Sequence, residues 1–244
     1  MKKLMISASA LLVASAATAE TVKMGTEGAY APWNFLDDNG VLAGFEIELG
    51  NELCARANLE CEWVVNEWDS IIPNLVAGNY DTIIAGMSIT AERDELIDFT
   101  QGYYPPDPSR WVATADLGMD VDPAGATVGV QGSTIQAAWV ADNLGDAVTI
   151  KEYATADESM ADLAAGVVDL VLADNGYLAP FVDNEAIFFV GDEILIGGGV
   201  GMGIRETDAE LRATFNAAID SVKADGTLDA LIAKYFETGP FYSN

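Results

Sequence analysis

The chain has 244 residues, half of them apolar, enough for one large domain or two small ones. Its formal net charge of −28 makes nucleic acid and anionic lipid surfaces poor partners. Histidine is absent, which excludes the usual zinc and copper sites and Ser-His-Asp catalysis. We therefore expect a solvated acidic surface, with neither a metal site nor a cofactor.

The N-terminus has the pattern of a secretory signal peptide. Two lysines precede an apolar run at 4–16, and a small-x-small cleavage site follows at 17–19. The apolar run is too short to span a membrane, and no later stretch reaches spanning length. We expect cleavage of residues 1–19 and a location in the periplasm.

The first part of the remaining chain alternates strands and helices, the order typical of an α/β sheet. Strand patterns occur at 21–25, 62–65 and 81–85, and helix patterns at 44–57 and 68–78. A loop is expected at 27–33, and residues 37–40 have the composition of a hairpin turn without calcium-loop spacing.

The two cysteines, Cys54 and Cys61, form an even pair in a chain predicted to be exported, which suggests a disulfide. Two buried thiols are the alternative. An unbroken helix between them would separate the Cα atoms by roughly 10 Å, beyond the limit of roughly 7 Å for a disulfide. The helix must end before Cys61, and we expect it to end near Asn58, because asparagine tolerates the left-handed conformation.

Residues 85–96 contain the strongest candidate binding motif. Gly86 permits a turn and the close approach of a ligand, and Thr90 stands where a helix N-cap is expected. Arg93 falls in the first helical turn, where a cation opposes the helix dipole. An anion held by the free N–H groups, the hydroxyl of Ser88 or Thr90 and the guanidinium would reverse that penalty. We predict a carboxylate clamp, with a capped surface helix as the alternative.

Proline-rich and glycine-rich segments separate a second α/β block from the first. The prolines of 105–108 cannot continue a helix or a central strand, so we place one crossing between lobes at 105–109. A glycine-rich strand at 194–203 is predicted to carry the return crossing, at 195–199. Between the crossings, strand patterns occur at 109–113, 126–130, 149–153, 167–173 and 186–190, and helix patterns at 134–141, 157–165 and 176–182.

The turn at 131–134 joins a strand to a helix with a hydroxyl cap, which makes a second candidate anion site. Two helices, at 208–224 and 227–236, end the chain.

Several segments together resemble the type-II periplasmic amino-acid-binding proteins of ABC importers, the family of histidine-, lysine/arginine/ornithine- and glutamine-binding proteins. They are GTEGAYAPWNF, GFEIELGNEL, the cysteine pair, IIPNLVAGNYDTIIAGMSITAER, VGVQGST and ADGTLDALIAKYF. The resemblance implies an α/β fold of two Rossmann-like lobes joined by two hinge strands. Lobe 1 would comprise 20–106 and 198–244, and lobe 2 would comprise 107–197.

The resemblance also implies how the main-chain groups of an amino acid are held. Arg93 would bind the α-carboxylate together with Ser88 and the backbone N–H of Thr134. Asp174 would accept a hydrogen bond from the α-ammonium, as would the backbone carbonyl of Gly86. A helix N-cap is the alternative, compatible role for Asp174.

The same resemblance places Tyr30 and Trp68 as aromatic walls around the ligand side chain. Glu27 would face the far end of that side chain, which favours a basic or amide-bearing amino acid. Ala85 and Gly86 replace the paired serines of the basic-amino-acid binders, and Ala-Gly occurs in glutamine-type binders.

We therefore expect a non-enzymatic monomer that captures a free polar or basic L-amino acid and delivers it to an inner-membrane ABC permease. One alternative is a periplasmic dehydratase acting on arogenate or prephenate. The other is a binder of ectoine-type compatible solutes, which Tyr30, Trp33 and Trp68 would hold.

Overall fold

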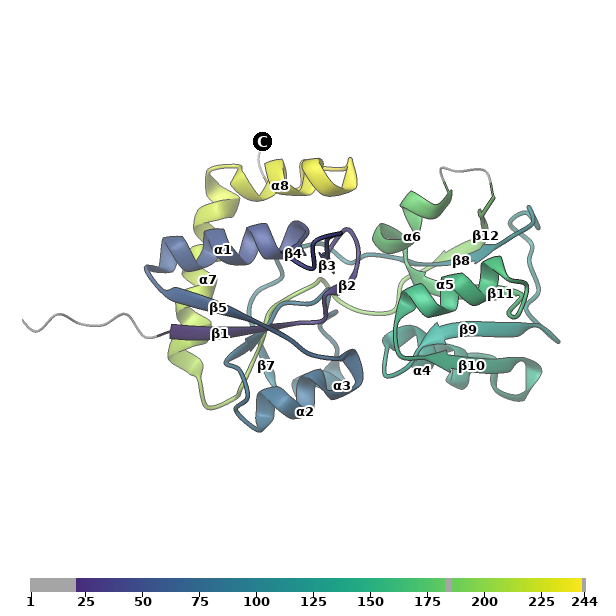
Figure 1. The fold of residues 1–244 in the computed structure, drawn as a ribbon, viewed down its shortest axis with the longest axis horizontal. Helices are drawn as coiled ribbons and strands as arrows, with labels where there is room; N and C mark the ends of the chain where they lie inside the picture. The colour runs from purple at the N-terminus through teal and green to yellow at the C-terminus, as the bar shows by residue number, and fades with distance from the viewer. Residues whose placement is uncertain (1–20, 183–185, 243–244) are drawn as a thin grey trace, which may run out of the picture.

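The computed structural model describes residues 21–182 and 186–242, so the predicted signal peptide lies outside the described residues. The described chain forms two lobes, each built on a five-stranded sheet with helices around it (Figure 1). The sheet of lobe 1 has the strand order β5-β1-β6-β13-β7, and that of lobe 2 has the order β10-β9-β11-β8-β12. The predicted two-lobed α/β fold is confirmed.

In lobe 1, β1 pairs in parallel with β5 and β6, whereas β13 lies antiparallel between β6 and β7. The strands are β1 (Thr21–Thr26), β5 (Glu60–Val65), β6 (Thr82–Ile83), β7 (Asp98–Phe99) and β13 (Gly203–Ile204). The helices are α1 (Phe45–Ala57), η1 (Trp68–Ser70), α2 (Ile71–Val76), α3 (Ala91–Asp94), α7 (Ala209–Ala224) and α8 (Thr227–Phe236). Strand β6 is shorter than predicted because the chain turns away at Gly86, whose φ is 62°.

The residues at both ends of helix α1 adopt backbone conformations with positive φ. Gly44 at its N-cap has a φ of 119°, and a Cβ atom there would lie 2.4 Å from the carbonyl oxygen of Trp33. Only glycine fits this close approach. At the other end Asn58 adopts the left-handed conformation, as predicted, and its N–H bonds to the last carbonyls of the helix.

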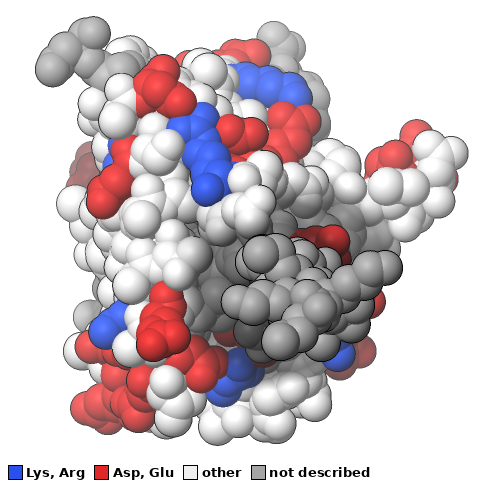
Figure 2. Space-filling view, turned by 90° about the vertical axis from the view of Figure 1, so that its left-hand side faces the viewer, with Lys and Arg blue, Asp and Glu red and all other residues white. Residues whose placement is uncertain are grey.

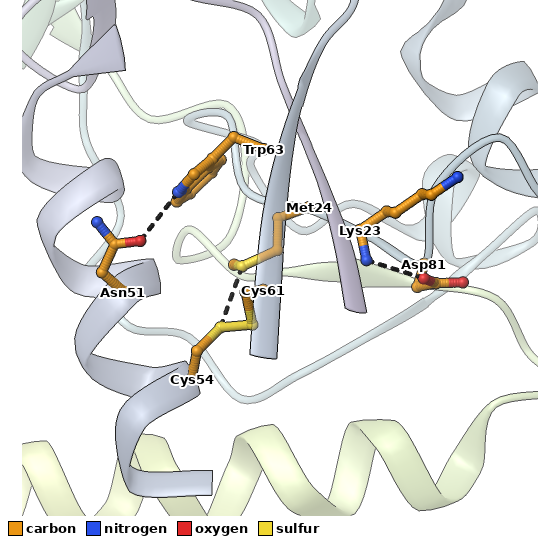
Figure 3. The surroundings of a disulfide bond; sticks show 7 residues. All are labelled: Lys23, Met24, Asn51, Cys54, Cys61, Trp63 and Asp81. Carbon is orange, nitrogen blue, oxygen red and sulfur yellow. Dashed lines mark hydrogen bonds between the residues drawn. A yellow bond between two sulfur atoms is a disulfide. The ribbon is translucent and has the colours of Figure 1, made fainter. Parts of the chain in front are cut away.

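The disulfide between Cys54 and Cys61 is formed, with Cα atoms 6.2 Å apart. Figure 3 shows that it ties α1 to β5 beside Met24 of β1, whose sulfur lies 3.3 Å from that of Cys54. The prediction that the helix ends between the two cysteines is confirmed.

In the chain, a small antiparallel sheet of three strands comes between β1 and α1. Its strands are β2 (Ala29–Tyr30), β3 (Asn34–Leu36) and β4 (Leu42–Ala43). The predicted hairpin turn at 37–40 joins β3 to β4, and Asp37 accepts hydrogen bonds from the N–H groups of Asn39 and Val41. The segment predicted as a loop therefore contains a short strand that carries Tyr30.

Lobe 2 combines a parallel set of strands with two antiparallel ones. β9 pairs in parallel with β10 and β11, and β8 lies antiparallel between β11 and β12. The strands are β8 (Ser109–Ala113), β9 (Thr127–Gln131), β10 (Thr149–Tyr153), β11 (Leu170–Asp174) and β12 (Phe188–Ile194). The helices are α4 (Ile135–Asn143), η2 (Gly145–Ala147), α5 (Ala156–Ala164) and α6 (Asn175–Val182).

Two chain segments connect the lobes, between β7 and β8 and between β12 and β13. Residues 105–108 and 195–199 fall in these segments, whereas Ser109, the last residue of the first predicted crossing, begins β8. The domain boundaries drawn from the crossings stay predictions. The continuous strand expected at 194–203 is wrong: β12 ends at Ile194, and Val200 makes only single bridges, to Ser88 and Tyr104. Those bridges hold the two crossings beside each other.

The surface carries charges of both signs. On the face of lobe 1 in Figure 2, acidic side chains lie in several groups, with Lys and Arg side chains between them. The described helices include none that is both long and apolar enough to cross a membrane.

Replacing Cys54 and Cys61 by alanine is expected to lower the free energy of unfolding by about 2 to 3 kcal/mol, because the bond closes a short loop in the unfolded chain. Urea denaturation of the oxidised wild type and of the double variant measures the difference. Reductant should lower the stability of the wild type by a similar amount and leave the variant unchanged. Equal stability of oxidised wild type and variant would contradict the prediction.

Candidate functional site

A cavity lies between the lobes and is lined by both. Strands β1, β6, β9 and β11 all end beside it, which is where α/β sheets bind ligands. Lobe 1 contributes Glu27, Tyr30, Trp68, Ala85, Gly86, Ser88 and Arg93, and lobe 2 contributes Gln131, Thr134, Ile135, Gln136 and Asp174. Every residue predicted for the amino-acid site therefore lines one cavity, and their individual roles toward a ligand stay predictions.

Arg93 lies on α3, where Thr90 is the N-cap and accepts a hydrogen bond from the N–H of Arg93. Its guanidinium donates to the carbonyl oxygen of Ser88 at 2.9 Å and lies over the ring of Trp68, 5.3 Å from the ring centroid. Burial lowers the pKa of Arg93 to about 10, against the opposing charge of Asp174. Because α3 is a four-residue helix, attraction for an anion here depends on the guanidinium and little on a helix dipole.

Asp174 is the last residue of β11 and faces the cavity from lobe 2. One carboxylate oxygen accepts a hydrogen bond from the side-chain amide of Gln136 at 2.7 Å, and the other accepts one from the hydroxyl of Tyr30 at 2.8 Å. Burial raises the pKa of Asp174 to about 6, although both hydrogen bonds and the charge of Arg93 lower it. Within the described part of the chain, neither Arg93 nor Asp174 forms an ion pair.

Glu27 follows β1 directly and is buried at another side of the cavity. Burial raises the pKa of Glu27 to about 7, and the negative charges of Asp157, Glu46 and Asp69 add to the effect. A hydrogen bond of 2.6 Å from the side-chain amide of Gln131 opposes it. The surroundings of Glu27 therefore have a deficit of positive charge.

The aromatic residues at the cavity belong to contacts that join the lobes. The ring of Tyr30 is stacked on that of Tyr177 in lobe 2, with centroids 4.5 Å apart. The indole N–H of Trp68 donates to the carbonyl oxygen of Ser133 at 3.1 Å. With the bonds from Tyr30 to Asp174 and from Gln131 to Glu27, these contacts close the cleft.

Trp33 is not at the cavity. It is 1% exposed and packs against Phe45, Tyr104 and Phe236 in the core. The hypothesis of a compatible-solute site built on Tyr30, Trp33 and Trp68 is wrong in this residue, because the indole of Trp33 is taken up by aromatic packing in the core.

Glu46 supports the cavity from behind. One oxygen of this buried carboxylate accepts hydrogen bonds from the N–H of Gly86, at 2.6 Å, and from the hydroxyl of Tyr103; the other accepts one from the side chain of Asn34. Asn34 in turn accepts a hydrogen bond from the N–H of Gly28. One carboxylate of α1 thus fixes the two loops that carry Glu27 and Gly86.

Sequence reasoning missed Gln131, Ile135 and Gln136. All three flank the predicted hydroxyl cap Thr134, whose side chain accepts a hydrogen bond from the N–H of Ala137. Their position between the carboxyl end of β9 and the start of α4 was the available signal. Within 21–182 and 186–242, no three acidic or cysteine side chains are grouped so that they could hold a metal ion.

Two α/β lobes, two connecting segments and a cavity between them define a hinged binding protein of the type-II fold. Residues 22–238 match the family described as bacterial extracellular solute-binding proteins, family 3. The chain belongs to this family.

Several named proteins are similar to this chain over most of its length. The lysine/arginine/ornithine-binding periplasmic protein of Escherichia coli K12 is 39% identical, over 91% of this chain and 90% of its own. The L-arginine-binding protein of Pseudomonas aeruginosa is 36% identical over the full length of both. A Silicibacter pomeroyi periplasmic protein of the His/Glu/Gln/Arg/opine-binding family, solved with lysine, is 57% identical over 91% of this chain and 100% of its own, with a TM-score of 0.84.

The empty protein is expected to lose stability as the pH rises from the usual pKa of Glu27, 4.5, to its folded value of about 7. In that window the folded state binds more protons than the unfolded state, so the free energy of unfolding falls with pH. Glu27→Gln should remove about 3 kcal/mol of this loss.

Chemical denaturation of ligand-free protein at a series of pH values measures this loss. Glu95→Gln, which changes an exposed glutamate of the same lobe, is the matched control. An unchanged slope in Glu27→Gln would contradict a protonated, buried Glu27.

Proposed function

We propose that this protein is an extracytoplasmic solute-binding protein that holds a polar or basic L-amino acid between its lobes and delivers it to an ABC permease. The observation that carries the proposal is the pair Arg93 and Asp174. These are partly buried charges of opposite sign, from different lobes, that lack ion-pair partners among the described residues and line one cavity.

A free amino acid supplies the missing partners of both charges. Its α-carboxylate matches the guanidinium of Arg93, with Ser88 and Thr134 beside it, and its α-ammonium matches the carboxylate of Asp174. Burial without a partner disfavours the charged forms of both side chains, as the lowered pKa of Arg93 and the raised pKa of Asp174 indicate. Binding a zwitterion would give each of these charges a partner of opposite sign.

Glu27 supports a ligand with a cationic side chain, of the lysine, arginine or ornithine type. Its carboxyl group is buried beside other acids, with Gln131 as a neutral hydrogen-bond donor. A ligand ammonium or guanidinium would supply the positive charge that this part of the cavity lacks. The names of the relatives agree with such a ligand. A ligand with an amide side chain is the second choice, because the Ala85-Gly86 pair occurs in glutamine-type binders.

The lobes would close on the ligand about the two connecting segments. Because Tyr30, Trp68 and Gln131 already make contacts between the lobes, the described arrangement corresponds to the closed state of such a cycle. The names of the relatives support the periplasm as the location. Delivery to an inner-membrane permease and a monomeric state are parts of the proposal, as is cleavage after residue 19.

The relatives favour binding over the dehydratase alternative, because those described above are all named as binding proteins. Incubation with arogenate separates the two functions: turnover would support the enzyme, and its absence together with amino-acid binding would support transport.

Calorimetry with lysine and two truncated analogues tests the two-charge clamp. Cadaverine lacks the carboxylate that Arg93 would bind, and ε-aminocaproate lacks the α-ammonium that Asp174 would bind. Each is expected to bind at least about 30-fold more weakly than L-lysine, since leaving a buried charge unpaired costs about 2 kcal/mol or more. If no proteinogenic amino acid binds, the proposal is rejected.

Arg93→Met should weaken binding of every accepted amino acid by at least about 30-fold, because it removes the same charge pair from the protein side. Arg212→Met is the control, since Arg212 pairs with Asp98 away from the cavity. Calorimetric titration of both variants with the preferred ligand gives the comparison. Affinity equal to that of the wild type in Arg93→Met would rule out the clamp.

Binding of a basic amino acid is expected to release protons and to weaken as the pH falls through the pKa values of Glu27, about 7, and Asp174, about 6. Both carboxyl groups must be charged in the complex, so each contributes up to about a tenfold loss per pH unit below its pKa. Titrations in buffers of different ionisation enthalpy count the protons. Glu27→Gln should keep only the part due to Asp174; proton uptake on binding would contradict the assignment.

A further inference from the structure

A second hollow lies on the connecting segment, apart from the amino-acid cavity. We name it the hinge groove; its walls are α8 and the following tail from lobe 1, α6 from lobe 2, and residues 104–108 of the crossing. In Figure 1 the C-terminal end of α8 points across the crossing toward α6. The groove thus has one wall from each lobe.

The walls of the hinge groove are aromatic. Tyr104, Phe236 and Phe241 line it, and the ring of Tyr104 contacts the other two, with its centroid 5.0 Å from that of Phe236 and 5.9 Å from that of Phe241. Phe241 is 44% exposed, which is high for a phenylalanine beside a cavity. Ring faces of this kind attract cations as well as apolar groups.

The hinge groove carries two acidic side chains. Asp107 lines it and accepts the N–H of Gly176 with one carboxylate oxygen, at 2.8 Å, while its other oxygen has no hydrogen-bond partner among the described residues. Glu237 adds a second acid. Lys234 also lines the groove, but its ammonium group is bound by both carboxylate oxygens of Glu48, at 2.6 and 2.7 Å. An anion would therefore find no uncompensated positive charge here.

We propose that the hinge groove binds a small organic cation with an apolar body, such as a quaternary ammonium ion, and that this binding stabilises the closed arrangement of the lobes. The cation would lie against the aromatic rings and beside the free oxygen of Asp107. Because both lobes form the walls of the groove, its shape depends on how the lobes are arranged. A molecule that fits the groove in the closed arrangement binds this arrangement more tightly than an open one, and so it raises the population of the closed state. By reciprocity it raises the affinity for the amino acid.

At neutral pH the carboxyl group of Asp107 is mostly protonated in the empty groove, so binding of a cation there would release a proton. Burial raises the pKa of Asp107 to about 8, and the negative charge of Asp174 adds to the effect. A nearby cation favours the charged carboxylate.

Choline is the probe, and its uncharged isostere, in which carbon replaces the nitrogen, is the matched control. Both are titrated into isotope-labelled protein, with and without saturating L-lysine, while amide shifts are followed by NMR. Choline should give saturable shifts around Asp107, Gly176 and Phe241 under both conditions, at least tenfold tighter than the isostere. Shifts confined to Glu27 and Trp68, equal binding of the isostere, or no saturable shift would overturn the proposal.

Two variants test the residues of the groove. Asp107→Asn keeps an oxygen for the N–H of Gly176 but removes the charge, and should weaken choline binding about tenfold. Phe241→Leu removes one ring and should weaken it several-fold. Asp120→Asn, which changes an exposed acid of lobe 2, gives the same change of net charge and should have no effect. Wild-type affinity in Asp107→Asn would overturn the assignment.

Coupling is measured by calorimetry with L-lysine at zero and saturating choline. The affinity for lysine should rise about fivefold. An unchanged or lower affinity would refute the stabilisation of the closed state. Because the choline titration without lysine stands on its own, failure of the hinge groove and failure of the amino-acid site give different results.

Discussion

The structure depends on one electrostatic constraint: charged groups taken out of water must find partners. Lobe 1 presents the guanidinium of Arg93 to the cavity, and lobe 2 presents the carboxylate of Asp174. Their shifted pKa values record how poorly the empty cavity compensates them. Glu27 is a third charged group without a partner of opposite sign among the described residues, and the charged side chains near it are acidic. The proposed amino-acid ligand would complete this set of charges.

The scaffold makes that arrangement possible by bringing loops from two sheets to one place. Glu27, Gly86 and Asp174 each lie at or just after the carboxyl end of a strand, so the sheets aim them into the cleft. Glu46 then fixes two of the loops by accepting the N–H of Gly86 and the side chain of Asn34. A helix residue that does not line the cavity therefore determines the shape of its wall.

Local signals in the sequence predicted the features that depend on neighbouring residues. The helix end at Asn58, the disulfide, and the caps at Thr90 and Thr134 follow from spacing and backbone preference. The grouping of Glu27, Tyr30 and Asp174 came from resemblance, because no local pattern reports which strand ends meet across a cleft. Tertiary packing decided the rest, such as the burial of Trp33 in the aromatic core and the placement of Gln131 and Gln136 at the cavity.

The position of β13 has a consequence for how the polypeptide reaches its native form. This strand lies between β6 and β7, so the sheet of lobe 1 has a gap until residues 203–204 arrive. The strands of lobe 2 all lie in one uninterrupted stretch of chain, from β8 to β12. When the chain emerges N-terminus first, lobe 2 can assemble while β6 still lacks its partner β13. The sheet of lobe 1, and with it the cavity between the lobes, is therefore completed late in folding.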